Sequence, residues 1–340
     1  MSKKRVTSFD VAKHAGVSRS LVSAVINNTP GIGISKETRE HILKSIEELN
    51  YHVDAGARSM KTGRSKCIAA FGCLESPLFP YLLEGVQLAC VKAGYHILIS
   101  GHIDGKQDRY ELLNLYYQRR IDGLITLDDT SYYDEAWRDE INKSRIPYVS
   151  VEGYVKDEQV HSILVDYAQS VRDALQFVSK TIRQNPVYIE VYNNESSTNW
   201  AEQQRRLAYI EWCKSKQAEP VIISIHLEDE QRYYDLLQQY QKEHGVIPPI
   251  LINWSYGAIY LYRAAYKLGL TIGKDIHLMS ADNTIRGNQL LVPTLSAMNI
   301  PYKQMGERAV IEVLKQMDKD HGSDHKKILF TPEILQGESV

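Results

Sequence analysis

The stretch that decides the fold of the N-terminal part is residues 7–28, TSFDVAKHAGVSRSLVSAVINN. Thr7 followed by Asp10 predicts a capping box, in which the hydroxyl and the carboxylate meet free N–H groups of a first helical turn. A helix therefore begins at Ser8. Gly16 ends this helix, because glycine takes the left-handed conformation at little cost. Ser18 is the N-cap of the next helix, so two short helices meet across a turn.

Apolar side chains on these helices are spaced to pack against each other. A third helix is expected from Ser35 to about Asn50 and closes a three-helix core. The residues expected on the packing faces are Val11, Ala12, Ala15, Val17, Val22, Val25, Ile26, Ile42, Leu43, Ile46 and Leu49.

Polar residues of the second helix point away from this core. They are Arg19, Ser20, Ser23 and Asn27, and they form a hydrogen-bonding surface of the size that a DNA major groove admits. The pattern alone favours DNA binding only weakly, because any compact pair of helices has a small residue in its turn.

The charge of the chain is divided unevenly. Residues 1–66 hold 12 Lys and Arg against 6 Asp and Glu, whereas the rest holds 28 against 36. A basic piece on an acidic body suggests a polyanion-binding head, with a merely solvated charged face as the alternative.

Three runs carry a family resemblance: VTSFDVAKHAGVSRSLVSAVINN, SKETREHILKSIEELNY and ARSMKTGRSK. They resemble the head and hinge of the lac-repressor/purine-repressor family of bacterial transcription regulators, although the loop NNTPGIGIS is about two residues longer, as loops tolerate. The resemblance implies that Arg19 and Ser20 read base edges, with Arg19 donating to guanine. A third reading position falls on Ala24, and Leu21 replaces a usual threonine. The alternative for Arg19 is contact with phosphate alone.

The hinge follows the head. Asp54 can cap a short helix over residues 55–61, which its glycine makes unstable alone. In similar regulators this segment becomes helical only on operator DNA, which gives Met60 the role of an apolar wedge in the minor groove and Lys61 a contact beside it. A flexible linker is the alternative. The residues expected to contact DNA are Thr7, Ser18, Arg19, Ser20, Ser23, Ala24, Asn27, Arg58, Met60 and Lys61.

From Cys67 onward, short apolar runs alternate with helical stretches, which predicts parallel, helix-covered sheets. The fold class is therefore a small all-α helix-turn-helix domain joined by a hinge to a bilobal α/β body, which the resemblance makes periplasmic-binding-protein-like. The expected domains are residues 1–50 for the head, 51–66 for the hinge and 67–340 for effector binding and dimerisation. Within the body we expect one lobe at about 67–166 and 297–321, and the other at about 167–296 and 322–340.

Ligands of such sheets bind at the carboxyl ends of the strands, hence between the lobes. The resemblance maps effector contacts onto the loop after the first strand, onto Arg205 in an Arg-x-x-Ala-aromatic run, and onto Asp282. An arginine and an acid converging there could bind hydroxyls or a carboxylate, so the effector is a sugar, an unusual sugar, or not a sugar. An ion pair between Arg205 and Asp282 is the alternative. The expected effector-binding residues are Ser76, Leu78, Phe79, Asp128, Arg205, Asn253, Trp254 and Asp282.

No catalytic motif occurs: Walker A, HExxH, GxSxG and a complete GxGxxG are absent. Asp128 and Asp129 suit turn or capping roles better than acid–base work. We expect no enzyme, no cofactor and no metal site, with the four cysteines as buried thiols. No apolar run spans a membrane and no signal peptide is recognised, so we expect a cytoplasmic protein.

The leading hypothesis is thus a transcription regulator that binds pseudo-palindromic operator DNA as a homodimer. It also binds a small-molecule effector, which either induces or relieves repression. We expect a repressor. A solute-binding protein and an α/β enzyme with a regulatory head are the alternatives. The DNA-binding head and the lack of a recognised signal peptide count against the first, and the absence of a catalytic motif counts against the second.

Overall fold

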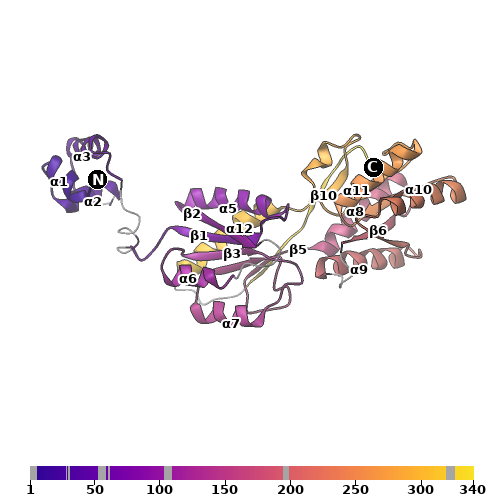
Figure 1. Cartoon of the computed structure of the whole chain (residues 1–340), viewed down its shortest axis with the longest axis horizontal. Coiled ribbons are helices and arrows are strands. Elements are labelled where there is room, and N and C mark those ends of the chain that lie inside the picture. Colours follow the sequence, from indigo (N-terminus) through magenta and orange to yellow (C-terminus); the bar gives the residue numbers. More distant parts are fainter. Residues whose placement is uncertain are drawn as a thin grey trace. The chain divides into compact units, whose positions relative to one another are not determined.

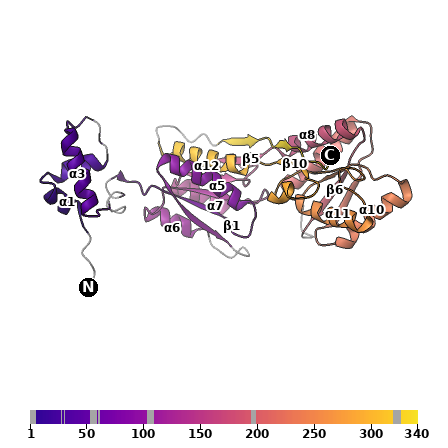
Figure 2. The same ribbon diagram turned by 90° about the horizontal axis from the view of Figure 1, so that it is seen from above.

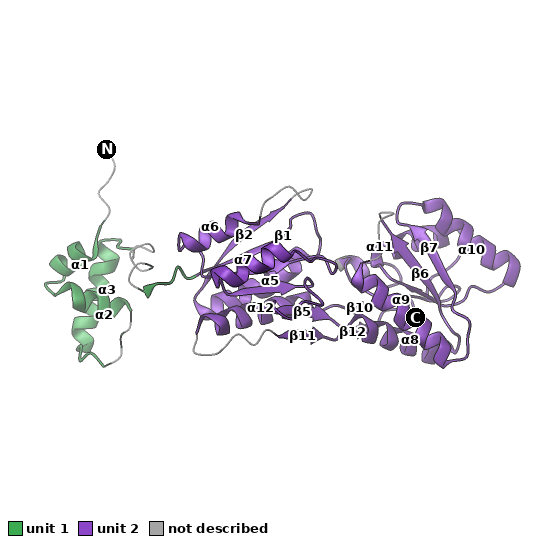
Figure 3. Ribbon diagram, turned by 90° about the horizontal axis from the view of Figure 1, so that it is seen from below, with its two compact units in different colours: residues 1–66 green, residues 67–340 purple. Residues whose placement is uncertain are grey.

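The computed structural model describes residues 6–27, 29, 31–52, 59, 62–102, 109–193, 199–318 and 326–340. It divides into two compact units, residues 1–66 and residues 67–340, which are considered separately (Figures 1 and 3).

The first unit, called the head, contains α1 (Ser8–His14), α2 (Arg19–Ile26) and α3 (Lys36–Glu48). Local capping sets where these helices begin. The backbone N–H of Thr7 donates to Asp10 Oδ2 at 2.8 Å, which completes the predicted capping box. Ser18 and Ser35 cap α2 and α3 through their hydroxyls. Gly16 has a φ of +64°, the left-handed value that the turn requires.

The three helices enclose a small apolar core in which Val11, Val22 and Ile42 are fully buried. The prediction for Leu43 was wrong, since its side chain is 48% exposed. Successive helical residues differ by about 100° in direction, so the position after Ile42 faces away from the core.

The second unit, called the body, begins with a six-stranded parallel sheet, the first lobe. Its strand order is β11-β5-β4-β3-β1-β2. The strands are β1 (Cys67–Cys73), β2 (His96–His102), β3 (Gly123–Leu127), β4 (Tyr148–Val151), β5 (Ser162–Val165) and β11 (Lys327–Phe330).

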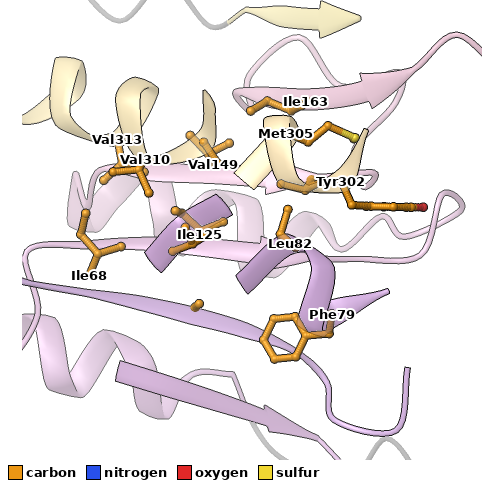
Figure 4. Close-up of a cluster of buried hydrophobic side chains, with 14 of the residues drawn as sticks. Ile68, Phe79, Leu82, Ile125, Val149, Ile163, Tyr302, Met305, Val310 and Val313 are labelled. Atoms are coloured by element: carbon orange, nitrogen blue, oxygen red, sulfur yellow. The ribbon is translucent and has the colours of Figure 1, made fainter. Parts of the chain in front are cut away.

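Helices cover both faces of this sheet, as a sheet with apolar faces on both sides requires. On one face lie α5 (Phe79–Ala93) and α12 (Tyr302–Met317), whose side chains pack on Ile68, Ile125 and Val149 (Figure 4). On the other lie α6 (Glu111–Tyr117) and α7 (Glu135–Ser144) around the buried Trp137 (Figure 1).

The contact between α5 and α12 is close because glycines stand where the helices cross. A Cβ atom on Gly85 would lie 1.8 Å from the carbonyl oxygen of Lys303, and one on Gly306 would lie 2.3 Å from that of Leu82. No larger residue fits either position without moving a helix.

The second lobe is a six-stranded sheet of order β12-β10-β9-β8-β6-β7, in which only β12 is antiparallel to its neighbour. Its strands are β6 (Val187–Tyr192), β7 (Ile222–His226), β8 (Ile250–Ile252), β9 (Leu278–Ser280), β10 (Ser296–Asn299) and β12 (Glu333–Leu335). The pair α8 (Tyr167–Ile182) and α9 (Trp200–Ser215) packs on one face, and the pair α10 (Glu230–His244) and α11 (Ser255–Leu268) on the other. Figure 2 shows α8 on the opposite side of β6 from α10 and α11, and Figure 3 shows α9 beside α8. A short 3-10 helix, η1 (Arg286–Gln289), precedes β10.

The chain crosses between the lobes three times, and two crossings differ from the sequence-based boundaries. Residues 297–299 belong to β10 of the second lobe, and residues 327–330 pair with β5 in the first, each opposite to expectation. The helix α7 and the strand β5 were not predicted. Strands of four residues carry too few side chains to specify a partner, which is set by pairing distant in sequence.

Cys90 and Cys213 are buried free thiols, whereas Cys67 and Cys73 are only half-buried, contrary to expectation. No helix in the described part of the chain is both long and apolar enough to cross a bilayer.

Candidate functional site

The exposed surface of α2 begins with Arg19 and Ser20, in its first turn, and ends with Asn27. Hydrogen bonds order the polar groups around it. The hydroxyls of Ser18 and Ser20 lie 2.8 Å apart, and Asn27 Nδ2 donates to Ser23 O at 2.8 Å. The helix therefore holds a row of polar side chains at a solvent-facing position, with the Arg19 guanidinium as its cation.

Two residues that were expected to contact DNA, Ala24 and Thr7, have structural roles within the head. Ala24 is only 5% exposed, because the chain turns back after α2 and the N–H of Thr29 donates to Ala24 O, so Ala24 belongs to the interior of the head. Thr7 is exposed, but its hydroxyl donates to Asp10 Oδ2 at 2.7 Å within the capping box. Arg58, Met60 and Lys61 lie outside the described residues.

In the body, a cavity of about 890 Å³ opens between the lobes, at the carboxyl ends of their strands. Of the expected effector-binding residues, six line it: Ser76, Leu78, Asp128, Arg205, Trp254 and Asp282. Aromatic side chains line it as well, among them Phe71, Tyr132, Tyr167 and Tyr302.

Phe79 and Asn253 do not line the cavity, and both have structural roles instead. Phe79 is 2% exposed and packs in the first-lobe core against Gly72, where any Cβ atom would lie within 2.7 Å of its ring. Asn253 is fully buried, and its side-chain amide accepts from Val191 N at 2.8 Å and donates to Val191 O at 2.9 Å. Each is the direct neighbour of a residue that lines the cavity, Leu78 or Trp254. The sequence could not tell which of two adjacent side chains points into the cavity and which into the protein interior.

Arg205 is 4% exposed, and its guanidinium carbon lies 4.4 Å from the centre of the Tyr167 ring. Burial is the largest single effect and lowers the pKa of Arg205, but electrostatic interactions with Tyr167, Asp282 and further tyrosines together raise it, so the group stays charged. Asp282 is committed elsewhere: it accepts from Ser255 N at 2.6 Å and also from Ser280 and Thr284. The expected convergence on one cavity is found, without direct pairing of arginine and acid among the ion pairs of the described residues.

Glu152, which sequence reasoning missed, also lines the cavity. It follows β4 directly, has a φ of +73° and is 2% exposed. Tyr167 donates its hydroxyl to Glu152 Oε1 at 3.0 Å. Burial raises the pKa of Glu152 to about 7, although the Tyr167 hydrogen bond and the Arg205 cation both favour the ionised form. Its position at the carboxyl end of a parallel strand was the signal that could have found it.

Arg109 is a second missed residue. Its Nη2 lies 3.2 Å from Asp128 Oδ1, and its guanidinium carbon lies 4.0 Å from the centre of the Tyr132 ring. Asp128 is held from the other side, since its Oδ2 accepts from Thr126 at 2.5 Å and from Ser150 at 2.7 Å. No motif marks Arg109 in the sequence.

The lobes touch beside the cavity at the N-terminus of α9. The backbone N–H of Trp200 donates to Ser131 Oγ at 3.2 Å, and that of Ala201 donates to Thr130 Oγ1 at 3.3 Å. Free N–H groups of a second-lobe helix are thus satisfied by first-lobe hydroxyls, which ties the lobes together.

A helix-turn-helix head with a polar second helix, and a two-lobed body with a ligand-sized cavity at its strand ends, together define a class of protein: the ligand-sensing DNA-binding regulators. Family models match both parts, "Bacterial regulatory proteins, lacI family" over residues 9–54 and "Periplasmic binding protein-like domain" over residues 177–340. The chain thus combines a helix-turn-helix domain of the lacI family with a periplasmic-binding-protein-like domain, and is a DNA-binding regulator of transcription.

Similar proteins align over nearly the whole chain. Catabolite control protein A of Priestia megaterium is 24% identical over 93% of both chains. The HTH-type transcriptional repressor PurR of Yersinia enterocolitica is 26% identical over 97% of this chain and 96% of its own. Among solved structures, the lac repressor dimer bound to operator and the anti-inducer ONPF has a TM-score of 0.76 at 18% identity, with 99% of each chain covered. These relatives are regulators rather than enzymes.

Proposed function

We propose that the protein is a homodimeric repressor whose affinity for a pseudo-palindromic operator is set by a small molecule bound between the lobes. The observation that carries this proposal is the cavity of about 890 Å³ with buried charged side chains from both lobes, in a chain that also has an exposed, polar recognition helix. The operator-bound lac repressor dimer, similar in fold, supports the same assembly.

On the DNA side, Arg19 and Ser20 contact base edges in the major groove. One short helix reads few base pairs, so two heads related by a two-fold axis are needed for specificity. The hinge residues Arg58, Met60 and Lys61 contact the minor groove, with Met60 as the wedge between base steps. These hinge roles rest on the sequence alone.

On the effector side, a ligand bridges Arg205 and Asp282 of the second lobe and Glu152 of the first. Because the lobes already touch through Thr130 and Ser131, ligand binding changes how firmly they close. Closure would favour or disfavour the folded hinge, which couples the two sites by about 1–3 kcal/mol.

The test is a titration of the full-length protein with operator-length duplexes from the promoters beside its own gene. We expect one duplex to bind at least a thousandfold more tightly than random DNA, and residues 62–340 alone to bind neither. Equal affinity for every duplex, or undiminished binding by the truncated chain, would contradict the proposal. A metabolite that changes operator affinity by fivefold or more identifies the effector.

A further inference from the structure

Unpaired buried polar atoms gather in the cavity between the lobes. In the described parts of the chain, five buried polar atoms without a hydrogen bond belong to residues that line it: His102 Nδ1, Arg109 Nη1, Asp128 Oδ1, Glu152 Oε2 and Arg205 Nε. Of these, Asp128 Oδ1 is ion-paired, because it lies 3.2 Å from Arg109 Nη2. Leaving a buried polar group without a partner costs about 1–3 kcal/mol, and more when it is charged. A molecule that fills the cavity therefore gains by supplying the partners.

The kinds of atom restrict what that molecule is. Arg109 Nη1 and Arg205 Nε can only donate a hydrogen bond, whereas the carboxylate oxygen Asp128 Oδ1 can only accept one, and so can Glu152 Oε2 when that side chain is ionised. The ligand must hence offer acceptors and donors side by side. A hydroxyl group is both, but a carboxylate or a phosphate dianion offers only acceptors.

The charges restrict it further. The carboxyl groups of Asp128, Asp129, Glu152 and Asp282 line the cavity, against the guanidinium groups of Arg109 and Arg205. The Arg109 cation is already neutralised by Asp128 at 3.2 Å. Asp129 is exposed, whereas Asp128, Glu152 and Asp282 are buried. These three acids would repel an anionic ligand at close range, where the low dielectric of the interior strengthens the repulsion.

The Arg109–Asp128 pair is rigid enough to select among ligands. Asp128 has a fully buried side chain with two hydroxyl donors on Oδ2. Gly153 packs beside it and leaves the room that Asp128 occupies, since a Cβ there would lie 2.8 Å from Asp128 Cβ. Arg109 lies among the rings of Tyr132, Phe71 and Trp137, with its guanidinium carbon 4.0, 5.3 and 5.6 Å from their centres. Arg109 Nη1, which makes no hydrogen bond, is thus a fixed donor, and Asp128 Oδ1, whose ion pair with Arg109 Nη2 leaves a carboxylate lone pair over, is a fixed acceptor.

We propose that Arg109 and Asp128 form a second effector subsite, in the first lobe, which binds hydroxyl groups of an uncharged polyhydroxylated effector and excludes carboxylates and phosphate esters. This inference rests on the proposed function, because it names the chemistry of the same effector. It makes Arg109 a specificity-determining residue alongside Arg205.

The test measures ligand binding by the full-length protein at pH 7.5, by thermal shift and then by calorimetry. The probes are neutral mono- and disaccharides, together with the phosphate ester and the acid derived from each. We expect a neutral probe to bind, and its phosphate ester to bind at least tenfold more weakly. Arg109→Gln should weaken the neutral probe roughly tenfold to a hundredfold, since a hydrogen bond to a charged group is lost. Arg232→Gln, at an exposed position of α10, is the matched control and should change nothing.

Asp128→Asn gives the sharper outcome, because it leaves the Arg109 cation without its partner carboxylate. The phosphate ester should then bind at least tenfold more tightly than it binds the wild type, while the neutral probe binds more weakly. If a single variant does not fold, the double variant Arg109→Gln/Asp128→Asn, which removes both charges, is compared with the wild type instead. It should bind the neutral probe more weakly than the wild type does.

A phosphate ester or acid that binds the wild type as tightly as its neutral parent would overturn the subsite, and so would a neutral probe that binds Arg109→Gln unchanged. If no probe stabilises the wild type, the assigned ligand class is wrong. If the protein then still binds its operator specifically, only the ligand class is refuted and the proposed regulator function stands. If it binds neither a probe nor an operator, both the subsite and the proposed function are refuted.

Discussion

Replacing Glu152 by Gln should change how the stability of the body depends on pH. Glu152 is 2% exposed, and burial raises its pKa from 4.5 to about 7. A folded-state pKa above the unfolded value means that the native protein binds more protons within that window, so the contribution to stability is complete below pH 4.5 and is lost as the pH rises through 7. At about 1.4 kcal/mol per pKa unit, the full loss is roughly 3 kcal/mol, and about 2.5 kcal/mol of it falls between pH 5 and pH 8.

Glutamine keeps the size of the side chain and an oxygen that can accept from Tyr167, but it does not ionise. The variant should thus be more stable than the wild type at pH 8 and close to it at pH 5. All four tryptophans lie in the body, at positions 137, 200, 212 and 254, so tryptophan fluorescence during urea unfolding reports on the body of the full-length chain. The exposed Glu219→Gln serves as the matched control. Free energies of unfolding for wild type and Glu152→Gln that run parallel from pH 5 to pH 8 would refute the reasoning.

Three further outcomes are expected. Arg19→Ala should weaken specific operator binding by about 1–3 kcal/mol and non-specific DNA binding far less. Fluorescence anisotropy at a series of salt concentrations measures both affinities. Equal losses of specific and non-specific binding would mean that Arg19 contacts phosphate only. Ile42→Ala, at a fully buried position, should destabilise the head by about 2–5 kcal/mol and abolish operator binding, with the tryptophan-detected unfolding of the body unchanged. Gly85→Ala should lower the melting temperature of the body by several degrees, because its Cβ would meet the Lys303 carbonyl; an unchanged melting temperature would show that α5 and α12 separate easily.

Sequence reasoning succeeded where short-range physics decides the structure. Thr7, Ser18 and Ser35 accept hydrogen bonds from N–H groups three residues ahead. Four consecutive residues therefore determine where each helix of the head begins. Signals of the same short range bound α10, whose N-cap Asp229 accepts from Arg232 N and whose C-cap Gly245 has left-handed backbone.

It failed where the answer depends on distant parts of the chain. Ala24 is buried by the chain that follows α2, and the strand at 296–299 pairs in the second lobe because Ala297 lies beside Ser280. Arg109 acquires its role only when β3 brings Asp128 to 3.2 Å from it. Neighbours of a site residue were also hard to assign, since Asn253 and Trp254 differ by one position but face the interior and the cavity respectively.

The three chain crossings in the body bear on how such proteins can be recombined. Exchanging the head for that of a relative requires one junction, near residue 66, whereas exchanging one lobe requires three, because each lobe is assembled from separated stretches of chain. Chimeras that trade operator preference while keeping the effector are thus a single graft. A new effector response must instead be engineered within the intact body, by substituting side chains around the cavity.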